Sequence, residues 1–146
     1  MSVVEEALAE ATQQVVGGLS VDSLVAGLAA LPDEIAVAKS RLADKRALVE
    51  DAESALKEVE ALLTASIAAE VKADGKPLFS NAEARQAEFI RRASREPSYK
   101  SAVIGVREAR KGLDAAQIEC QRLEDSFKAT RSAAEVMSAL LHAVGH

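Results

Sequence analysis

A seven-residue repeat of small and apolar residues runs without interruption from Tyr99 to Val144. It covers more than six heptads and contains no proline, so it predicts one helix about 70 Å long at 1.5 Å per residue. Such a helix, with one narrow apolar stripe, is unstable alone in water and needs a partner helix of the same period. The repeat positions are Tyr99, Ala102, Val106, Ala109, Leu113, Ala116, Cys120, Leu123, Phe127, Thr130, Ala134, Met137, Leu141 and Val144.

A second heptad pattern follows Pro32 and predicts a helix from about Pro32 to Lys72. Both patterns alternate large residues with alanine, which lets two backbones approach closely. Lys45 is the one charged residue in this second pattern, and we expect it to fix the register or reach out to solvent. The repeat positions are Ile35, Ala38, Leu42, Lys45, Val49, Ala52, Leu56, Val59, Leu63 and Ser66.

The segment between the two helices contains turn and cap signals. Asp74 and Gly75 predict a turn, and Ser80 with Glu83 predicts a capping box, with Phe79 packing onto the first helical turn. A short helix over residues 81–95 should follow, and Pro97 should begin the long helix. The expected fold is therefore all-α: a long antiparallel coiled-coil hairpin over residues 32–146, with a short helix at its tip, residues 73–97.

Residues 1–31 predict two short helices that form a separate N-terminal segment. The first spans residues 2–16 and ends at Gly17 and Gly18, and the second begins near Ser20 and is interrupted by Pro32. They could pack on the end of the long helix or pair with a second copy. The abundance of helix formers, with four aromatic residues in 146, is typical of elongated helical proteins, for which we expect an oligomer.

The charge is unevenly distributed, although the net charge is only -5. Residues 72–111 hold ten basic and five acidic residues, whereas residues 1–71 hold five basic and thirteen acidic ones. The basic tip could bind nucleic-acid phosphates, with an aromatic ring stacking on a base. It could instead bind an acidic protein. It could also be a solvated surface on which charges form ion pairs, such as Glu88–Arg92 and Glu124–Lys128. The candidate contact residues are Lys76, Phe79, Arg85, Arg91, Arg92, Arg95, Tyr99 and Lys100.

The sequence has no signature of an enzyme, a metal site or a cofactor site. It contains no phosphate loop, zinc-spaced cysteines or nucleophile elbow, and Cys120 on the repeat is expected to be a buried thiol. Glu5 and Glu6 do not fit a secretory signal, and no apolar run approaches the ~20 residues that span a bilayer. We expect a cytoplasmic protein without a membrane partner.

Three segments resemble small helical proteins encoded by bacteriophages and prophages: GKPLFSNAEAR at residues 75–85, Tyr99, and FKATR at residues 127–131. The resemblance covers about residues 70–135. It implies a phage or mobile-element origin, a location in the bacterial host cytoplasm, and an accessory role near DNA replication or recombination. It supplies no catalytic residues.

These observations lead us to expect a non-enzymatic helical interaction protein, phage-encoded, that docks on host or phage DNA-processing machinery through its basic tip. Two alternatives remain open. One is direct binding of DNA or RNA by the same residues, and the other is a purely structural coiled-coil oligomer.

Replacing Leu113 or Leu56 with aspartate tests the two heptad patterns. Each change would bury an unpaired charge between the helices, so the variant should lose most of its helical signal in circular dichroism. Full helicity in both variants would remove the heptad assignment.

Overall fold

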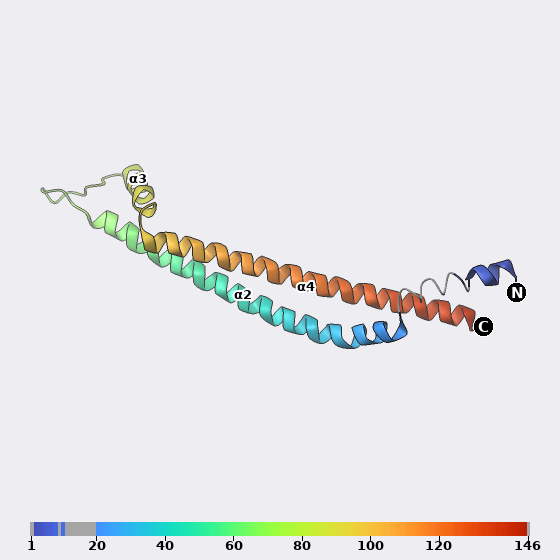
Figure 1. Ribbon diagram of the computed structural model, residues 1–146. Helices are drawn as coiled ribbons and strands as arrows, with labels where there is room; N and C mark the ends of the chain where they lie inside the picture. The colour runs from blue at the N-terminus through green and yellow to red at the C-terminus, as the bar shows by residue number, and fades with distance from the viewer. Residues whose placement is uncertain (1, 9, 11–19, 146) are drawn as a thin grey trace. The chain divides into compact units, whose positions relative to one another are not determined.

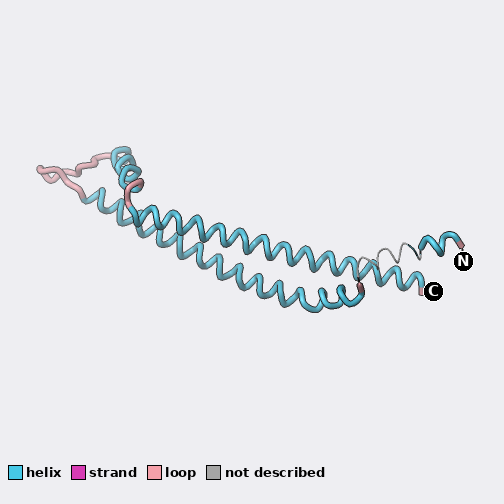
Figure 2. Tube along the Cα trace, viewed as in Figure 1, coloured by secondary structure: helices cyan, strands magenta, loops and turns pink. Residues whose placement is uncertain are grey.

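The computed structural model describes residues 2–8, 10 and 20–145, which are mostly helical (Figures 1 and 2). Its named helices are α2 (Val21–Ala69), α3 (Ala82–Ala93) and α4 (Pro97–Val144). Within the described residues there is no strand, only an isolated bridge between Val71 and Pro77. The all-α prediction is confirmed. No described helix is both long and apolar enough to cross a membrane.

Helices α2 and α4 pack against each other, and the chain divides into two compact units. The first contains Met1–Arg41 and Gln117–His146, and the second contains Leu42–Ala116. In the first unit, Gly27 of α2 faces Thr130 of α4, since a Cβ atom added to Gly27 would lie 3.3 Å from Thr130 Cγ2. Lys39 of α2 pairs with Glu124 of α4, with 3.7 Å between Nζ and Oε1. Residue numbers therefore rise along α2 as they fall along α4, which is the antiparallel arrangement.

The heptad positions of α4 form its buried face from Tyr99 to Met137. Val106, Cys120, Leu123 and Met137 are buried, and Cys120 is a free thiol. Leu141 and Val144, the last two positions of the repeat, are exposed. Val21, the first residue of α2, lines the same groove as Leu141, so the last turn of α4 has no further turn of α2 to pack on.

The predicted break at Pro32 is wrong, because α2 continues through this residue. Proline inside a helix costs about 3 kcal/mol, since it removes one backbone hydrogen bond and crowds the preceding turn. Leu24 and Ala38, on either side of Pro32, are both buried, and this packing offsets the cost. The second predicted N-terminal helix is therefore the beginning of α2.

The first predicted N-terminal helix is present in part. Residues 3–8 and 10 are helical, and Ser2 caps them: Glu5 N donates to Ser2 Oγ at 3.3 Å, and Ser2 N donates to Glu5 Oε2 at 2.9 Å. The rest of this prediction, including the stop at Gly17 and Gly18, lies outside the described residues.

Helix α2 ends at Ala69, three residues before the predicted end at Lys72. The chain then turns back through the Val71–Pro77 bridge, with Gly75 at a φ of 82° that favours glycine. Lys76 N donates to Asp74 Oδ1 at 3.0 Å, which confirms the predicted turn. Ser66, the last predicted repeat position of α2, is exposed. The next residue, Ile67, is buried in its place and is only 2% exposed.

Helix α3 begins one residue later than its predicted cap would place it. Asn81, with extended backbone angles, accepts a 2.7 Å hydrogen bond from Ala84 N through its side chain. The predicted capping box of Ser80 and Glu83 is therefore wrong; asparagine is at least as good an N-cap as serine, and here it takes that position.

Lys45 lies on the packed face as expected, in a structural role. A Cβ on Gly112 would lie 3.6 Å from Lys45 Cδ and 3.9 Å from its Nζ. The aliphatic stem thus lies against α4 where glycine leaves room for it, and Lys45 is half-buried. This pair fixes one point of the register in the second unit.

Replacing Pro32 with alanine should stabilise the protein, because it restores the missing backbone hydrogen bond of a packed helix. We expect the free energy of unfolding, measured by urea denaturation, to rise by about 1–3 kcal/mol.

Pro97→Ala is the matched control for this change. Pro97 is the first residue of α4, where its missing N–H has no helical partner to lose, so this variant should gain no stability. Equal gains in both variants would contradict the explanation given for Pro32.

Candidate partner-binding site

The eight predicted contact residues all lie in the second unit, between the end of α2 and the first turn of α4. The structure separates them by their contacts. Arg91, Arg92, Phe79 and Tyr99 contact other side chains, whereas Lys76, Arg85, Arg95 and Lys100 are exposed and have no ion pair or ring contact within the described residues.

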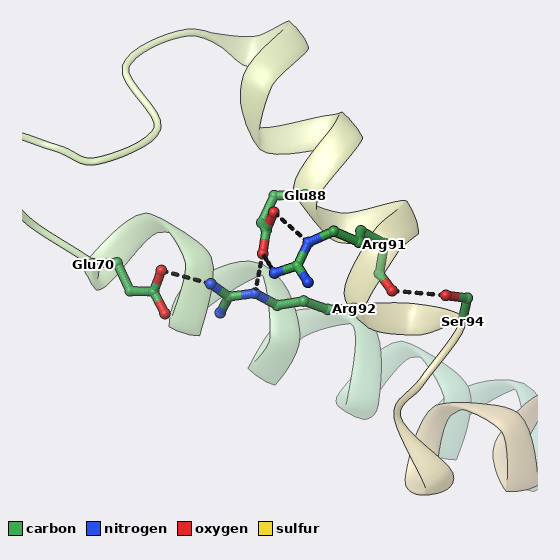
Figure 3. A network of polar contacts seen from close by, with 5 residues as sticks. All are labelled: Glu70, Glu88, Arg91, Arg92 and Ser94. Carbon is green, nitrogen blue, oxygen red and sulfur yellow. Dashed lines mark hydrogen bonds and ion pairs between the residues drawn. The ribbon is translucent and has the colours of Figure 1, made fainter.

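Arg91 and Arg92 belong to an ionic network centred on Glu88, whose side chain is only 10% exposed (Figure 3). Arg91 Nε donates to Glu88 Oε2 at 3.0 Å, and Arg91 Nη2 also donates to Glu88. Arg92 Nε donates to Glu88 Oε1 at 2.6 Å, and Arg92 Nη2 donates to Glu70 Oε2 at 2.6 Å. Because Glu70 directly follows α2, the Arg92–Glu70 ion pair links α3 to the end of that helix.

These contacts fix the charge states of the network. Side-chain hydrogen bonds from Arg91 and then Arg92 lower the pKa of Glu88 to about 2. The side-chain hydrogen bond to Glu88 raises the pKa of Arg91. Side-chain hydrogen bonds to Glu70 first, and then to Glu88, raise the pKa of Arg92. Glu88, Arg91 and Arg92 therefore remain charged at neutral pH. The predicted pair Glu88–Arg92 is confirmed, whereas Glu124 pairs with Lys39 instead of Lys128.

The two predicted aromatic residues are held by neighbouring side chains. The guanidinium carbon of Arg92 lies 5.8 Å from the centroid of the Phe79 ring, a cation–π contact. Arg85 Nη1 donates to the Phe79 carbonyl oxygen at 3.3 Å. Tyr99 meets Phe89 edge to face, with ring centroids 5.9 Å apart. Both rings are half-buried, so part of each ring is already covered before any ligand binds.

An open apolar groove of about 440 Å³ lies between α3 and α4. Ile90 and Ile104 are 60% and 54% exposed, while buried Ala93 and the Phe89–Tyr99 pair form part of the lining. The exposed isoleucines stand on both walls of the groove, so one apolar ligand could cover them together. The groove is lined by Phe89, Ile90, Ala93, Ser94, Tyr99, Lys100, Val103 and Ile104.

The margin of this groove is positively charged. Lys100 belongs to its lining, Arg95 follows Ser94, and Arg107 lies one helical turn beyond Val103 and Ile104. Their side chains have no ion pair or hydrogen bond within the described part of the chain. By contrast, Arg110 pairs with Glu53 and Lys111 with Glu108. Lys100, Arg95 and Arg107 are therefore the cations most accessible to a ligand in the groove.

Tyr99 and Lys100 in the groove were predicted contact residues, whereas Ile90, Val103 and Ile104 were not. A signal was present: Ile104 lies between the repeat positions Ala102 and Val106, so an antiparallel partner helix cannot cover it. Ile90 is likewise an aliphatic residue on a short helix rich in charged side chains.

Comparisons with protein-family models, curated proteins and solved structures give no match to this chain. The chemistry of the site therefore follows from its geometry. An apolar floor with a cationic margin suits an apolar segment that carries carboxylates. Among residues 2–8, 10 and 20–145, no group of three or more histidine, cysteine, aspartate or glutamate side chains could hold a metal ion.

The lowered pKa of Glu88 predicts an acid-sensitive contribution to stability. Glu88 has a pKa of about 2 in the folded chain and an ordinary value of 4.5, so the unfolded chain binds more protons between these values. The contribution is complete above pH 4.5 and is lost as the pH falls toward 2. Glu88→Gln should lack this component of the pH dependence, measured by urea denaturation across that range.

Glu58→Gln is the matched control, because Glu58 is exposed on α2. This variant should follow the wild-type pH profile. If the Glu88→Gln profile also runs parallel to the wild type, Glu88 does not have the lowered pKa.

Proposed function

We propose that this chain is a non-enzymatic interaction protein, built on an antiparallel coiled coil of α2 and α4, that binds an apolar, acidic helix of a partner protein between α3 and α4. The supporting observation is the groove itself, with Ile90 and Ile104 exposed on its two walls. In this proposal α2 and α4 are the scaffold, and α3 is the second wall of the binding site.

Burial of the two isoleucines supplies the affinity in this proposal. Fully burying an aliphatic side chain is worth about 1.5–3 kcal/mol, so covering the exposed parts of both is a substantial share of a micromolar interaction. An amphipathic helix is the usual ligand of a groove between two helices, because its apolar stripe matches the groove in width. Lys100 and Arg107, seven residues apart on α4, lie on one face and could pair with carboxylates along the ligand.

Arg91 and Arg92 have a positioning role in this proposal. Replacing either with glutamate would bring a third carboxylate beside Glu88 and Glu70 and would destabilise the attachment of α3. The predicted contact residues that remain exposed to a partner are Lys76, Arg85, Arg95 and Lys100.

The resemblance over residues 70–135 supports a partner among host or phage DNA-processing proteins in the bacterial cytoplasm. The groove lies within this part of the chain, since its lining residues run from Phe89 to Ile104. On this basis the chain acts as an accessory protein that reaches its machinery through a protein contact.

Direct nucleic-acid binding is the second candidate, and the turn between α2 and α3 favours it. Lys72 and Lys76 are both exposed there, and Lys72 N donates to the Lys76 carbonyl at 2.7 Å, which holds the two residues together. Two such lysines with Arg95 could contact consecutive phosphates. Binding of this kind weakens steeply with added salt, because it releases counterions.

Substituting the groove isoleucines tests the proposed function. A chain with Ile90→Glu and Ile104→Glu should keep its helicity, because both side chains are exposed, and should capture bacterial partner proteins at least tenfold less than the wild type. The measurement is affinity capture from bacterial lysate with quantitative mass spectrometry, alongside anisotropy titrations of labelled single-stranded and duplex DNA at two salt concentrations.

Leu62→Glu is the control, since Leu62 is an exposed aliphatic residue of the same unit that does not line the groove. It should leave capture unchanged. Salt-sensitive DNA binding that persists in the isoleucine variant and disappears on Lys72→Glu with Lys76→Glu would favour the second candidate instead.

A further inference from the structure

We propose that the groove between α3 and α4 also binds the N-terminal helix, of which residues 2–8 and 10 are described, of a second copy of this chain. This inference rests on the proposed function, because it names one occupant of the same groove. Two complementary surfaces within the described residues support this contact.

The N-terminal helix has the chemistry that the groove requires. Val3 and Val4 are 81% and 75% exposed, so they are left uncovered within their own chain. At 3.6 residues per turn, Val3, Val4 and Ala7 share one face, with Glu5 on one side of it and Glu6 and Glu10 on the other. The segment therefore presents an apolar stripe between carboxylates, and it contains no basic side chain.

The groove offers the complementary pattern. Ile90, Val103 and Ile104 supply apolar walls for the valines, and Lys100 and Arg107 supply positive charges at the margin. The Ser2–Glu5 cap keeps the first helical turn formed before it binds, which lowers the entropy cost of association. Opposite charges on the two surfaces also favour this pairing over contact between two grooves or between two N-terminal helices.

The predicted contact is heterologous, since it joins two different surfaces of the chain. Each copy carries one helix and one groove, so one copy can donate a helix while its own groove remains available to another copy or to a partner. A partner protein with a similar acidic helix would compete with the second copy for the same residues. Self-association would then limit how many grooves are free.

Mixing two variants tests this arrangement directly with the full chain. The first variant, Val3→Ser with Val4→Ser, removes the apolar stripe but keeps every carboxylate. The second, Ile90→Glu with Ile104→Glu, disables the groove. By sedimentation velocity the wild type should associate as its concentration rises, each variant alone should associate at least tenfold more weakly, and an equimolar mixture should recover a complex with one copy of each.

Circular dichroism establishes that both variants retain wild-type helicity before they are mixed, and Leu62→Glu is again the control that should associate normally. The inference is overturned if the wild type remains monomeric, if either variant associates as strongly as the wild type, or if the mixture recovers no complex. These measurements use purified chain only. A failure here thus leaves the capture experiment to decide the proposed function separately.

Discussion

Neither α2 nor α4 can bury its apolar stripe alone, and this constraint determines most of the structure. The stripes alternate large and small side chains, and glycines beside them leave room for side chains of the other helix, as Gly27 does for Thr130 and Gly112 does for Lys45. Few of the described residues are fully buried, and most positions of the two heptad patterns are only half-buried. Stability therefore comes from many modest contacts along the helices, without a single compact core.

Helix α3 is held differently. Its buried residues are Glu88 and Ala93, and an ion pair joins its Arg92 to Glu70, the residue that follows α2. Such a network stabilises one orientation of α3, because Glu88, whose side chain is only 10% exposed, depends on Arg91 and Arg92 to balance its charge. The exposed groove depends on that orientation, since α3 contributes Phe89, Ile90 and Ala93 to its wall. Helix α3 thus contributes residues both to the ionic network and to the apolar groove.

Periodicity predicted the helices well, because the burial of a stripe leaves its spacing in the sequence. The prediction failed where local rules compete with packing. Pro32 indicated a break, yet Leu24, Leu28 and Leu31 continue in phase with Ile35, and an uninterrupted phase was the better indicator of one helix. Likewise Ser80 and Glu83 fitted a capping box, but Asn81 was an equally good cap one residue later.

The candidate site was predictable only in its charge. Counting basic residues located the segment but could not show which of them were already paired, because the Glu70–Arg92 contact joins residues 22 positions apart. The exposed isoleucines were visible as apolar residues outside the heptad pattern. Their assembly into a groove, however, depends on the angle at which α3 meets α4, and no local sequence rule specifies that angle.

Cys120 gives the chain one chemical reporter of its own dynamics. Its thiol is buried on the packed face of α4, in the first unit, and it is the only cysteine of the 146 residues. A buried thiol reacts with an alkylating reagent only when the helices around it separate. The rate at which Cys120 is alkylated therefore measures how often α2 and α4 open at that point, without any label or substitution.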